Sequence, residues 1–487
     1  MVDSLYSKSG FPSVFVDFGL LFLEAVVSVL SAVLFFEISG FPLLVLWLVA
    51  GGLFFTFKLG FVNIKLFRHA IDVVRGKYSS KDDPGEVTHF QALVAAVSAT
   101  VGLGNIAGVA IAVSMGGPGA VFWMMVAGFL GMSTKFAEVT LGQKYRKIDA
   151  NGKVSGGAFY YLSEGLAEMN YPRLGKVLAV VFAICCIGGS FGGGNLFQAN
   201  QTVTIMTDSF DVLTNMDWII SLVIAVAVGT VLIGGIKRIA IVAEAVVPFM
   251  AFIYIGASVV VLVVNADKVP AAIAFIFQDA FSGVALGGGL VGALISGFRR
   301  AAFSNEAGLG SAPIAHAAAK TKEPVREGVV ALLEPFLDTM IICFISGIVI
   351  TVTGVYEGNV DGAVSGVLLT SSAFATVADW FPKVLSVAVA LFAFSTMITW
   401  SYYGERSWNY LFHGKGVGIY HIIFCCVAFL GGVVSDIALV VDFSDLLTLS
   451  MAFPNLIGLY FLSGHVKTEL DIYKTKLKDG DFRLSVH

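Results

Sequence analysis

The sequence predicts an all-α polytopic membrane protein with about 11 transmembrane helices, and three observations support this fold class. First, 57% of the 487 residues are hydrophobic and only 13% are charged, which is about half the charged share of a typical soluble domain. Second, the mean hydropathy is +0.86. Third, long apolar runs follow one another along nearly the whole chain, and a bilayer core needs about 20 apolar residues per helix.

Eleven apolar stretches are long enough to cross a bilayer, and they lie at 42–64, 91–116, 119–141, 175–206, 217–235, 239–264, 284–318, 329–353, 383–403, 417–435 and 437–462. The fourth and seventh are long and glycine-rich, so we expect them to bend or break. A further apolar stretch at 14–36 carries Asp17, Glu24 and Glu37. We interpret it as a helix in the membrane interface, with a twelfth span as the alternative. The predicted organisation is therefore an interfacial segment at 1–41, a transmembrane domain at 42–465 and a cytoplasmic tail at 466–487.

Basic residues are concentrated in every second loop between these stretches. The loops that contain Lys77 and Lys147 are rich in Lys and Arg, whereas the loop at 207–216 carries Asp208 and Asp211 but no basic residue. Cytoplasmic loops of membrane proteins carry an excess of Lys and Arg. The pattern predicts that the basic loops face the cytoplasm and that 207–216 and 354–381 face outside.

Several classes of function are disfavoured by the same sequence. A net charge of −4 argues against nucleic acid as a partner, and the five cysteines lie in apolar runs without disulfide or metal-ligand spacing. The N-terminus lacks a basic region before its first apolar stretch, so we expect no cleaved signal peptide. Gly102, Gly104 and Gly108 nearly match a dinucleotide-binding loop, but the last spacing is wrong and no strand precedes them. We therefore expect neither an enzyme nor a resident cofactor.

Two segments 206 positions apart resemble each other, Ser98–Asn105 and Ser304–Ser311. Each has Ser, three further residues, Gly-Leu-Gly and then a small polar residue. They fall in the second and seventh apolar stretches, so an odd number of spans separates them and their orientations across the membrane are opposite. Inverted repeats of this kind are a signature of secondary transporters, while the alternative is chance similarity in a glycine-rich chain.

The repeated segments, Val101–Gly108 and Phe303–Gly310, are also predicted to interrupt their helices. Each glycine lowers helix propensity by about 1 kcal/mol relative to Ala, and an interrupted membrane helix must satisfy its freed backbone groups inside the protein. A substrate carboxylate on the amides and a cation on the carbonyls would do so. Tight helix packing is the alternative, because Gly104 and Gly108 also form a G-x-x-x-G pattern.

Four longer motifs resemble the alanine or glycine:cation symporter family. They are Gly102-Leu-Gly-Asn-Ile-Ala-Gly108, Gly116-Gly-Pro-Gly-Ala-Val-Phe-Trp123, Gly194-Asn-Leu-Phe-Gln-Ala-Asn200 and Phe303-Ser-Asn-Glu-Ala-Gly-Leu-Gly-Ser-Ala-Pro313. The resemblance runs from about residue 42 to 465. One departure is Ala301, which follows the basic pair Arg299-Arg300 where the family pattern has Gly. The added methyl group leaves the size of the expected pocket open.

The resemblance implies uptake of alanine or glycine driven by sodium or by protons, across the plasma membrane of a prokaryote. It also implies the five-plus-five inverted repeat of the leucine-transporter type, here preceded by one extra helix. Another five-plus-five cation-coupled carrier, for a different small solute, is the alternative. A channel is disfavoured because the sequence offers no candidate selectivity filter.

By the same resemblance, the amides of Leu103 and Gly104 hold the substrate carboxylate and the carbonyl of Thr100 faces its ammonium group. The expected substrate-binding residues are Thr100, Leu103, Gly104, Asn105, Gln198, Gln201, Ala301, Phe303 and Thr396. Sodium is expected at the carbonyls of Ser98 and Val101 with the hydroxyls of Ser395 and Thr396. The expected sodium ligands are Ser98, Val101, Phe392, Ser395 and Thr396.

Further polar residues lie within the apolar stretches. Asn195, Gln198 and Gln201 are spaced on one helical face, so their amides are expected either to face a polar substrate or to bond between helices. Carboxylates inside a membrane are costly and are candidate contacts for a coupling ion; some of them are alternatively partners of Arg299 or Arg300. The intramembrane carboxylates are Glu244, Glu334, Asp338, Asp442 and Asp445.

Overall fold

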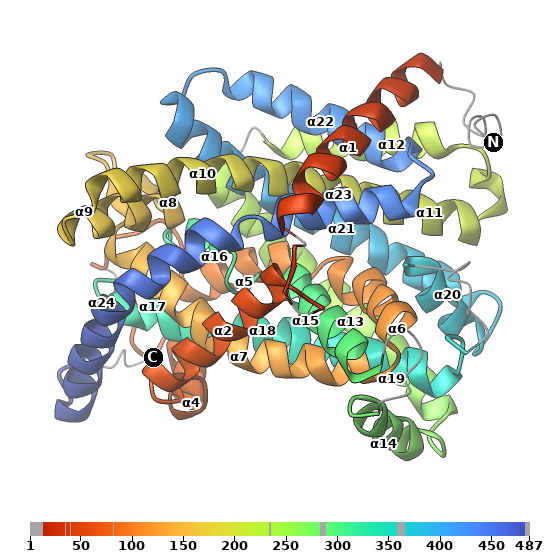
Figure 1. The fold of residues 1–487 in the computed structure, drawn as a ribbon, viewed down its shortest axis with the longest axis horizontal. Coiled ribbons are helices and arrows are strands. Elements are labelled where there is room, and N and C mark those ends of the chain that lie inside the picture. Colours follow the sequence, from red (N-terminus) through yellow and green to blue (C-terminus); the bar gives the residue numbers. More distant parts are fainter. Residues whose placement is uncertain are drawn as a thin grey trace.

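The computed structural model is a bundle of helices (Figure 1). It describes residues 13–34, 36–38, 40–80, 82–232, 235–282, 289–357 and 366–482. Ahead of the first repeat lie α1 (Ser13–Leu34), α2 (Leu43–Lys58), α3 (Val62–Lys65) and α4 (Phe67–Val74). Two short antiparallel hairpins accompany the helices, with β1 (Glu37–Ile38) paired to β2 (Phe41–Pro42) and β3 (Lys147–Ile148) paired to β4 (Val154–Ser155).

The remaining helices follow the two halves of the predicted repeat. The first half contains α5 (His89–Thr100), η1 (Gly104–Gly108), α6 (Val109–Gly116), α7 (Gly119–Lys144), α8 (Ala158–Tyr160), η2 (Tyr161–Gly165), α9 (Leu166–Glu168), α10 (Pro172–Phe191), η3 (Gly192–Leu196), α11 (Phe197–Ser209), η4 (Asp211–Leu213), α12 (Asp217–Leu232) and α13 (Gly235–Val264). The second half contains α14 (Val269–Asp279), α15 (Gly289–Asn305), α16 (Ala312–His316), α17 (Pro324–Ala331), α18 (Leu333–Pro335), η5 (Phe336–Cys343), α19 (Phe344–Thr353), α20 (Val367–Ala375), α21 (Phe381–Phe412), α22 (Val417–Val433), α23 (Ile437–Leu449) and α24 (Ala452–Asp479).

Each predicted transmembrane stretch contains a helix. By length and composition, the described residues hold six helical segments able to cross a bilayer, and α5 with η1 and α6 forms a bent seventh. The shorter apolar helices α2, α12 and α22 occupy three more predicted stretches. The seventh stretch contains α15 and α16, although its first residues, 284–288, lie outside the described residues. Helices α14 and α20 were not predicted; α20 lies in the connection at 354–381, of which 358–365 are not described.

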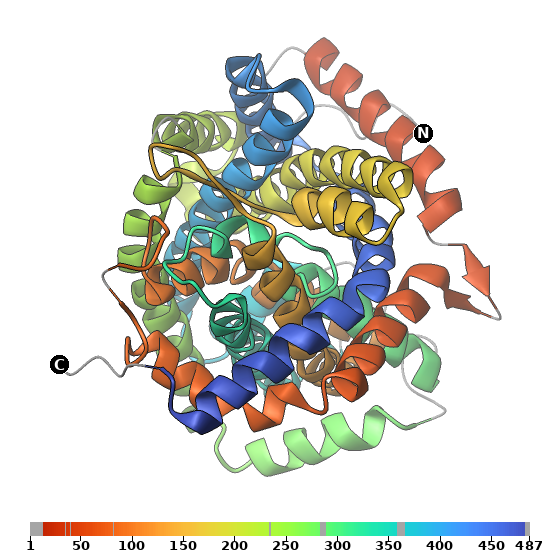
Figure 2. The same cartoon turned by 90° about the vertical axis from the view of Figure 1, so that its left-hand side faces the viewer.

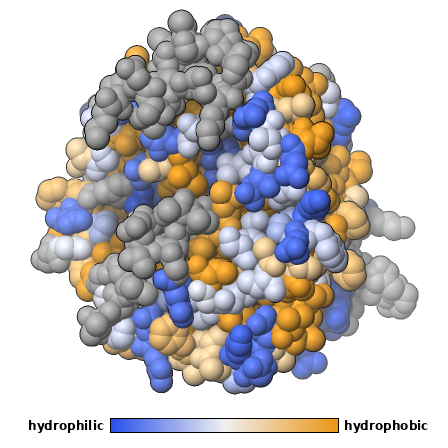
Figure 3. Space-filling model, turned by 90° about the vertical axis from the view of Figure 1, so that its right-hand side faces the viewer, coloured by the Kyte–Doolittle hydropathy of each residue, from blue (hydrophilic) through white to orange (hydrophobic). Residues whose placement is uncertain are grey.

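The arrangement of the helices separates the two kinds of loop. In Figure 1, α4, α9 and the end of α24 lie at the left, and α11, α14 and α20 lie at the right. These groups come respectively from the basic and the non-basic sides of the predicted topology. The face seen in Figure 3, at the right-hand end, presents hydrophilic side chains among hydrophobic ones. Around the flanks, large apolar side chains are exposed, as at Phe252 (77%) and Val263 (68%) on α13 and Ile422 (66%) on α22. Lipid tails are the solvent that suits such a surface.

Both repeated segments break their helices. Helix α5 ends at Thr100 and the chain resumes as η1 and α6 with a bend of 52°. Helix α15 ends at Asn305, and an irregular segment, 306–311, leads to α16. Glu306, Gly308 and Gly310 all have positive φ angles, of 57°, 90° and 78°. In Figure 1 the path from α5 to α6 runs from left to right and that from α15 to α16 runs the other way.

One end of the bundle is closed by pairing between distant segments of the chain. The guanidinium of Arg146, after α7, donates to the carbonyls of Ala317 at 2.7 Å, Ala319 at 2.6 Å, Pro84 at 2.9 Å and Thr321 at 2.6 Å. Four main-chain acceptors from two segments thus meet at one side chain. Figure 2 views this end, where α24 crosses the bundle beside α2 and α17.

The two terminal helices pack on the bundle. Helix α1 contacts α22 and α23, with the rings of Phe22 and Phe443 6.5 Å apart; its predicted place in the membrane interface stays a prediction, and residues 1–12 are outside the described part. Helix α24 continues without interruption past residue 465, where the transmembrane domain was predicted to end, and into the predicted tail as far as Asp479. Its Tyr473 hydroxyl lies 2.8 Å from Nε2 of His69 on α4, so the tail is docked against the bundle.

Candidate functional site

A polar pocket lies where the two broken helices meet. Ten residues line it and enclose about 240 Å³ of space not filled by atoms: Ala99, Thr100, Gly104, Gly193, Gln198, Phe303, Glu306, Thr396, Trp400 and Thr448. They come from α5, η1, η3, α11, α15, the segment that follows α15, α21 and α23. A Cβ atom added at Gly104 would lie 3.1 Å from Cα of Ser304, so the two breaks are in direct contact.

The first break is held open by side-chain amides. The amide of Gly102 donates to Oδ1 of Asn105 at 2.8 Å, and the amide of Leu103 donates to Oε1 of Gln198 at 3.1 Å. The Gln198 side chain in turn donates to the carbonyl of Gly193 at 2.9 Å. Gln198 therefore occupies an amide that was expected to hold a substrate carboxylate, and it lines the pocket beside that amide.

A cluster of oxygen atoms joins α5 to α21 beside the pocket. The Thr396 hydroxyl donates to the carbonyl of Ser98 at 3.1 Å, and the Ser98 hydroxyl donates to the carbonyl of Ser395 at 2.9 Å. The hydroxyl of Thr399 lies 3.0 Å from that of Ser98. All four residues are at most 1% exposed. Thr399 was not predicted from the sequence. It lies on the same helix as Thr396, one residue before Trp400.

The other expected sodium ligands differ in their placement. The hydroxyl of Ser395 donates to the carbonyl of Phe392 at 3.0 Å, within its own helix. Ser and Thr in membrane helices commonly bond back in this way. Val101 lies fully buried directly after the last residue of α5, with its amide donating to the carbonyl of Val97. The structure thus brings Ser98, Ser395, Thr396 and Phe392 together.

Glu306 lines the pocket but was not among the predicted site residues, and neither were Ala99, Gly193, Trp400 and Thr448. It is 2% exposed, and its carboxylate accepts a hydrogen bond from Nε1 of Trp400 at 3.0 Å and another from the hydroxyl of Ser311. Both hydrogen-bond donors are neutral, so a carboxylate lies beside the pocket without a direct ion pair. The signal was available in the Phe303–Pro313 motif, since an acidic residue inside an apolar stretch is a functional candidate.

Phe303 lines the pocket from α15 and is covered by charged residues. The guanidinium of Arg300 lies 5.2 Å from the centroid of its ring. Arg300 pairs with Asp445 of α23, and Nε of Arg299 also donates to Asp445 at 2.7 Å. Two residues were expected near the substrate but lie elsewhere: Ala301 packs with the apolar side chains of α6 and α7, and Gln201 accepts a hydrogen bond from the amide of Val367 at 2.9 Å. Neither lines the pocket, because each side chain faces a neighbouring helix.

Asn105, another expected substrate contact, faces a second buried polar cluster. Its Nδ2 donates to Oδ1 of Asp338 at 2.6 Å, and the hydroxyls of Ser304 and Thr339 lie 3.0 Å and 2.7 Å from Oδ2. The remaining intramembrane carboxylates have other partners. Asp442 and Asp445 pair with the basic pair of α15, Glu334 pairs with Lys135, and Glu244 accepts from Nε2 of Gln91.

Two side-chain amides of the segment from η3 to α11 donate hydrogen bonds to a neighbouring part of the chain. Nδ2 of Asn195 donates to the carbonyl of Phe424 at 2.7 Å, and Nδ2 of Asn200 donates to that of Val434 at 2.7 Å. For these two residues the structure supports the interhelical alternative, whereas Gln198 alone of the three predicted amides lines the pocket.

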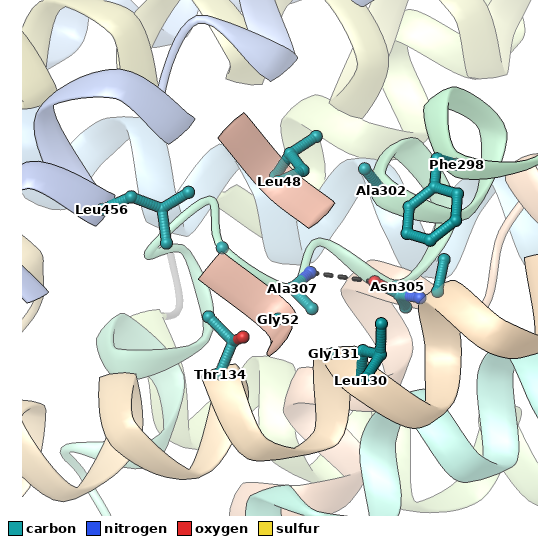
Figure 4. A pocket seen from close by; sticks show the side chains of 12 residues that line it. Leu48, Gly52, Leu130, Gly131, Thr134, Phe298, Ala302, Asn305, Ala307 and Leu456 are labelled. Carbon is teal, nitrogen blue, oxygen red and sulfur yellow. Dashed lines mark hydrogen bonds between the residues drawn. The ribbon is translucent and has the colours of Figure 1, made fainter. Parts of the chain in front are cut away.

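A second cavity, of about 350 Å³, lies on the other side of the irregular segment and is shown in Figure 4. Leu48, Leu456 and Phe298 line it, and Oδ1 of Asn305 accepts a hydrogen bond from the amide of Ala307 at 2.9 Å at its edge. That bond supports the backbone where α15 ends. The predominantly aliphatic lining does not suit a zwitterion.

Comparisons with known proteins agree with this geometry. The profile of the sodium:alanine symporter family matches residues 22–485. The chain is 42% identical over 431 residues to the sodium/alanine symporter AgcS of Methanococcus maripaludis, covering 88% of this chain and 93% of that one. It is 34% identical over 440 residues to the "Probable sodium/glutamine symporter GlnT" of Bacillus subtilis, covering 90% and 89%. The crystal structure of MhsT in complex with L-phenylalanine has the same fold, with a TM-score of 0.57 at 14% identity over 80% of this chain and 99% of that chain.

Proposed function

This chain belongs to the sodium:alanine symporter family and is a cation-coupled amino acid carrier with a leucine-transporter-type fold; from this premise we propose that it takes up alanine and other small neutral amino acids together with sodium. Two of its relatives are named for different substrates, AgcS as a sodium/alanine symporter and GlnT as a probable sodium/glutamine symporter. The choice between such substrates therefore depends on the pocket of this chain.

The observation that carries the proposal is that groups of opposite charge line one pocket. The half-helix η1 begins at Gly104, a lining residue, and its first amides present a partial positive charge. The Glu306 carboxylate also lines the pocket, and within the described residues its hydrogen-bond donors, Trp400 and Ser311, are neutral. An amino acid zwitterion matches this arrangement, with its carboxylate at the half-helix and its ammonium group near Glu306. Oε1 of Gln198 already accepts a hydrogen bond from the Leu103 amide. When the substrate binds, the Gln198 side chain would turn away from this amide or share it with the substrate carboxylate.

The aromatic and glycine residues around the pocket favour a small side chain. An added Cβ atom at Gly193, which lines the pocket, would lie 2.9 Å from the Phe303 ring, and one at the next residue, Gly194, would lie 2.3 Å from the Trp400 ring. A single methyl group is thus already too large at this position of the wall and at the residue that follows it. We expect alanine, glycine and serine to compete for uptake, and leucine and tryptophan to be excluded.

The oxygen cluster between α5 and α21 is the proposed sodium site. Sodium is a hard cation, and hydroxyl and carbonyl oxygens suit such ions. Oxygen ligands of Ca²⁺, an ion of nearly the same size, lie about 2.3–2.6 Å from the metal. The Thr396 hydroxyl and the Ser98 carbonyl are 3.1 Å apart, so one ion can touch both. Thr399 joins Ser98, Ser395 and Thr396 as a proposed ligand, because its hydroxyl contacts that of Ser98.

The test is uptake of radiolabelled alanine by proteoliposomes that contain the purified protein. Uptake should require an inward sodium gradient, and unlabelled glycine or serine should compete while leucine should not. A potassium gradient of equal size, with the membrane voltage clamped, is the control. Uptake that ignores sodium, or that leucine blocks as well as alanine does, would contradict the proposal.

We place the protein in the cell membrane of a prokaryote, because the relatives named above come from an archaeon and a bacterium.

A further inference from the structure

A row of five ionisable side chains runs through the interior of the bundle, beside the pocket. His89 Nδ1 contacts Oε2 of Glu327, and Oε1 of Glu327 lies 2.5 Å from Nδ1 of His316. Nε2 of His316 lies 2.5 Å from Oε1 of Glu334, whose Oε2 accepts a hydrogen bond from Lys135 at 3.1 Å. None of these side chains is more than 2% exposed. The five side chains come from five elements, namely α5, α17, the end of α16, α18 and α7.

The histidine in the middle of the row contacts a carboxylate through each ring nitrogen. An imidazole carries a proton on both nitrogens only in its cationic form, and in its neutral form it donates from one and accepts at the other. His316 can therefore take a proton at Nδ1 from Glu327 and release one from Nε2 to Glu334. Such a ring connects two carboxylates in the way that proton shuttles do.

One end of the row lies near the predicted cytoplasmic surface. His89 is the first residue of α5, next to the exposed N-cap residue Thr88. Its Nε2 is buried and has no hydrogen-bond partner within the described part of the chain. The charged groups around this end are engaged elsewhere: Arg326 contacts Asp83, and Arg146 binds main-chain carbonyls.

The other end of the row lies near the irregular segment of the second broken helix. Lys135 and Glu138 lie three residues apart on α7, so their side chains share one face of that helix. Glu138 accepts a hydrogen bond from the amide of Gly310 at 3.0 Å, and Glu306 of the same irregular segment lines the substrate pocket. Glu138 therefore connects the end of the row to this segment.

We propose that this row transfers a proton between the cytoplasmic surface and the acids at the second broken helix during the transport cycle. His89 takes a proton at Nε2 and passes its Nδ1 proton to Glu327. The proton then enters the His316 ring at Nδ1, while the ring releases its Nε2 proton to Glu334. Lys135 gives one of its own protons to Glu138, which lies three residues further along α7, and Glu334 replaces it. Each group then carries its original charge, but both histidine rings hold their proton on the other nitrogen, so each ring must turn over before the next proton can pass.

The transfer has a consequence for the substrate. A proton that passes on from Glu138 to Glu306 removes the negative charge that is proposed to face the ammonium group, so release of the amino acid becomes easier. This consequence depends on the proposed role of Glu306, whereas the proton transfer itself does not. Since the row starts at the predicted cytoplasmic side, the pH inside the vesicle or cell is the variable that should act on it.

The experiment measures sodium-driven alanine uptake at a fixed outside pH while the inside pH is varied in proteoliposomes of known protein orientation. The wild type should speed up as the inside becomes more acidic, by up to about tenfold per pH unit where a single proton limits the rate. His316→Gln keeps hydrogen bonds but cannot relay a proton, so its rate should change less than about twofold over the same range. The matched control is His421→Gln, because His421 contacts Glu405 at 3.1 Å outside the row, and it should keep the wild-type response.

Two results would overturn the proposal: a wild-type rate that is independent of the inside pH, or a wild-type pH response in His316→Gln. Because His316 is fully buried, that variant can fail to fold. His89→Gln, at the end of the row, then serves as the second variant, with the same flattening expected. A merely structural role for the row would lower the amount of folded protein without flattening the pH response of the fraction that transports.

Discussion

Replacing Thr396 by valine removes one hydroxyl from the proposed sodium site and keeps the shape of the side chain. The hydroxyl crosses from α21 to the carbonyl of Ser98, 3.1 Å away, instead of bonding back to its own helix. That contact separates the two interpretations of this residue. A hydroxyl that only satisfies its own helix could be lost with little effect, whereas an ion ligand at the break could not.

The expected size of the effect follows from the burial of the site. Thr396 is 1% exposed, so water cannot replace the lost ligand without opening the helices. Hydrogen bonds and contacts to charged groups in such places contribute about 1.5–3 kcal/mol. At about 1.4 kcal/mol per factor of ten, the sodium concentration for half-maximal uptake should rise by about tenfold to a hundredfold.

The assay is initial-rate alanine uptake as a function of sodium concentration, with the alanine dependence repeated at saturating sodium. The alanine dependence should change much less, since the ion acts through its occupancy. Ser407→Ala is the control, because Ser407 is also buried on α21 but bonds to the carbonyl of Tyr403 in its own helix. Unaltered sodium dependence in Thr396→Val, in a protein that unfolds at the wild-type temperature, would refute the proposed site.

Four further changes test other parts of the reasoning. Glu306→Gln should reduce the preference for alanine over propionate, which lacks the ammonium group, in competition assays; an undiminished preference would remove Glu306 from the site. Gly193→Ala should abolish uptake by folded protein, because its Cβ would lie 2.5 Å from Oγ1 of a threonine and 2.9 Å from an aromatic ring; normal uptake would show that the wall yields. A cysteine in place of Asp211 should react with an impermeant thiol reagent added outside and one in place of Lys147 should not, and the reverse would invert the topology. Burial lowers the pKa of His69 from 6.5 to about 4, so the stability present above pH 6.5 should fall as the pH drops towards 4, and the melting temperature of His69→Gln should fall less over that window.

The sequence predicted those features of the fold that have a strong local signal. Every apolar run that was predicted to cross the membrane contains a helix, because a helix in lipid must bury its backbone bonds and present apolar side chains. The glycine-rich repeats located both breaks, since glycine is the residue that weakens a helix most after proline. The short helices α14 and α20 were missed because each lies in a connection, where neither length nor periodicity marks a span.

The site was only partly predictable, because its residues come from distant segments. Five of the residues predicted to bind the substrate line the pocket, namely Thr100, Gly104, Gln198, Phe303 and Thr396, and their contact with the substrate stays a prediction. The direction in which a buried side chain points depends on its neighbours from other helices. A single sequence does not show which helices pack against each other. Asn105 contacts Asp338 because η5 lies beside it. Thr399 and Glu306, which were not predicted, make their contacts only where α21 meets the broken helices.

The cluster around Arg146 has a kinetic consequence for the carrier. Its guanidinium binds carbonyls from two segments of the chain, and these bonds share one planar group. Separating the segments by a small distance would strand several acceptors at once without admitting enough water to solvate them. If this end parts during transport, a partly separated arrangement would be higher in free energy than either the closed or the fully parted one. Such a barrier would make the movement at this end abrupt and would oppose leakage of ions between productive cycles.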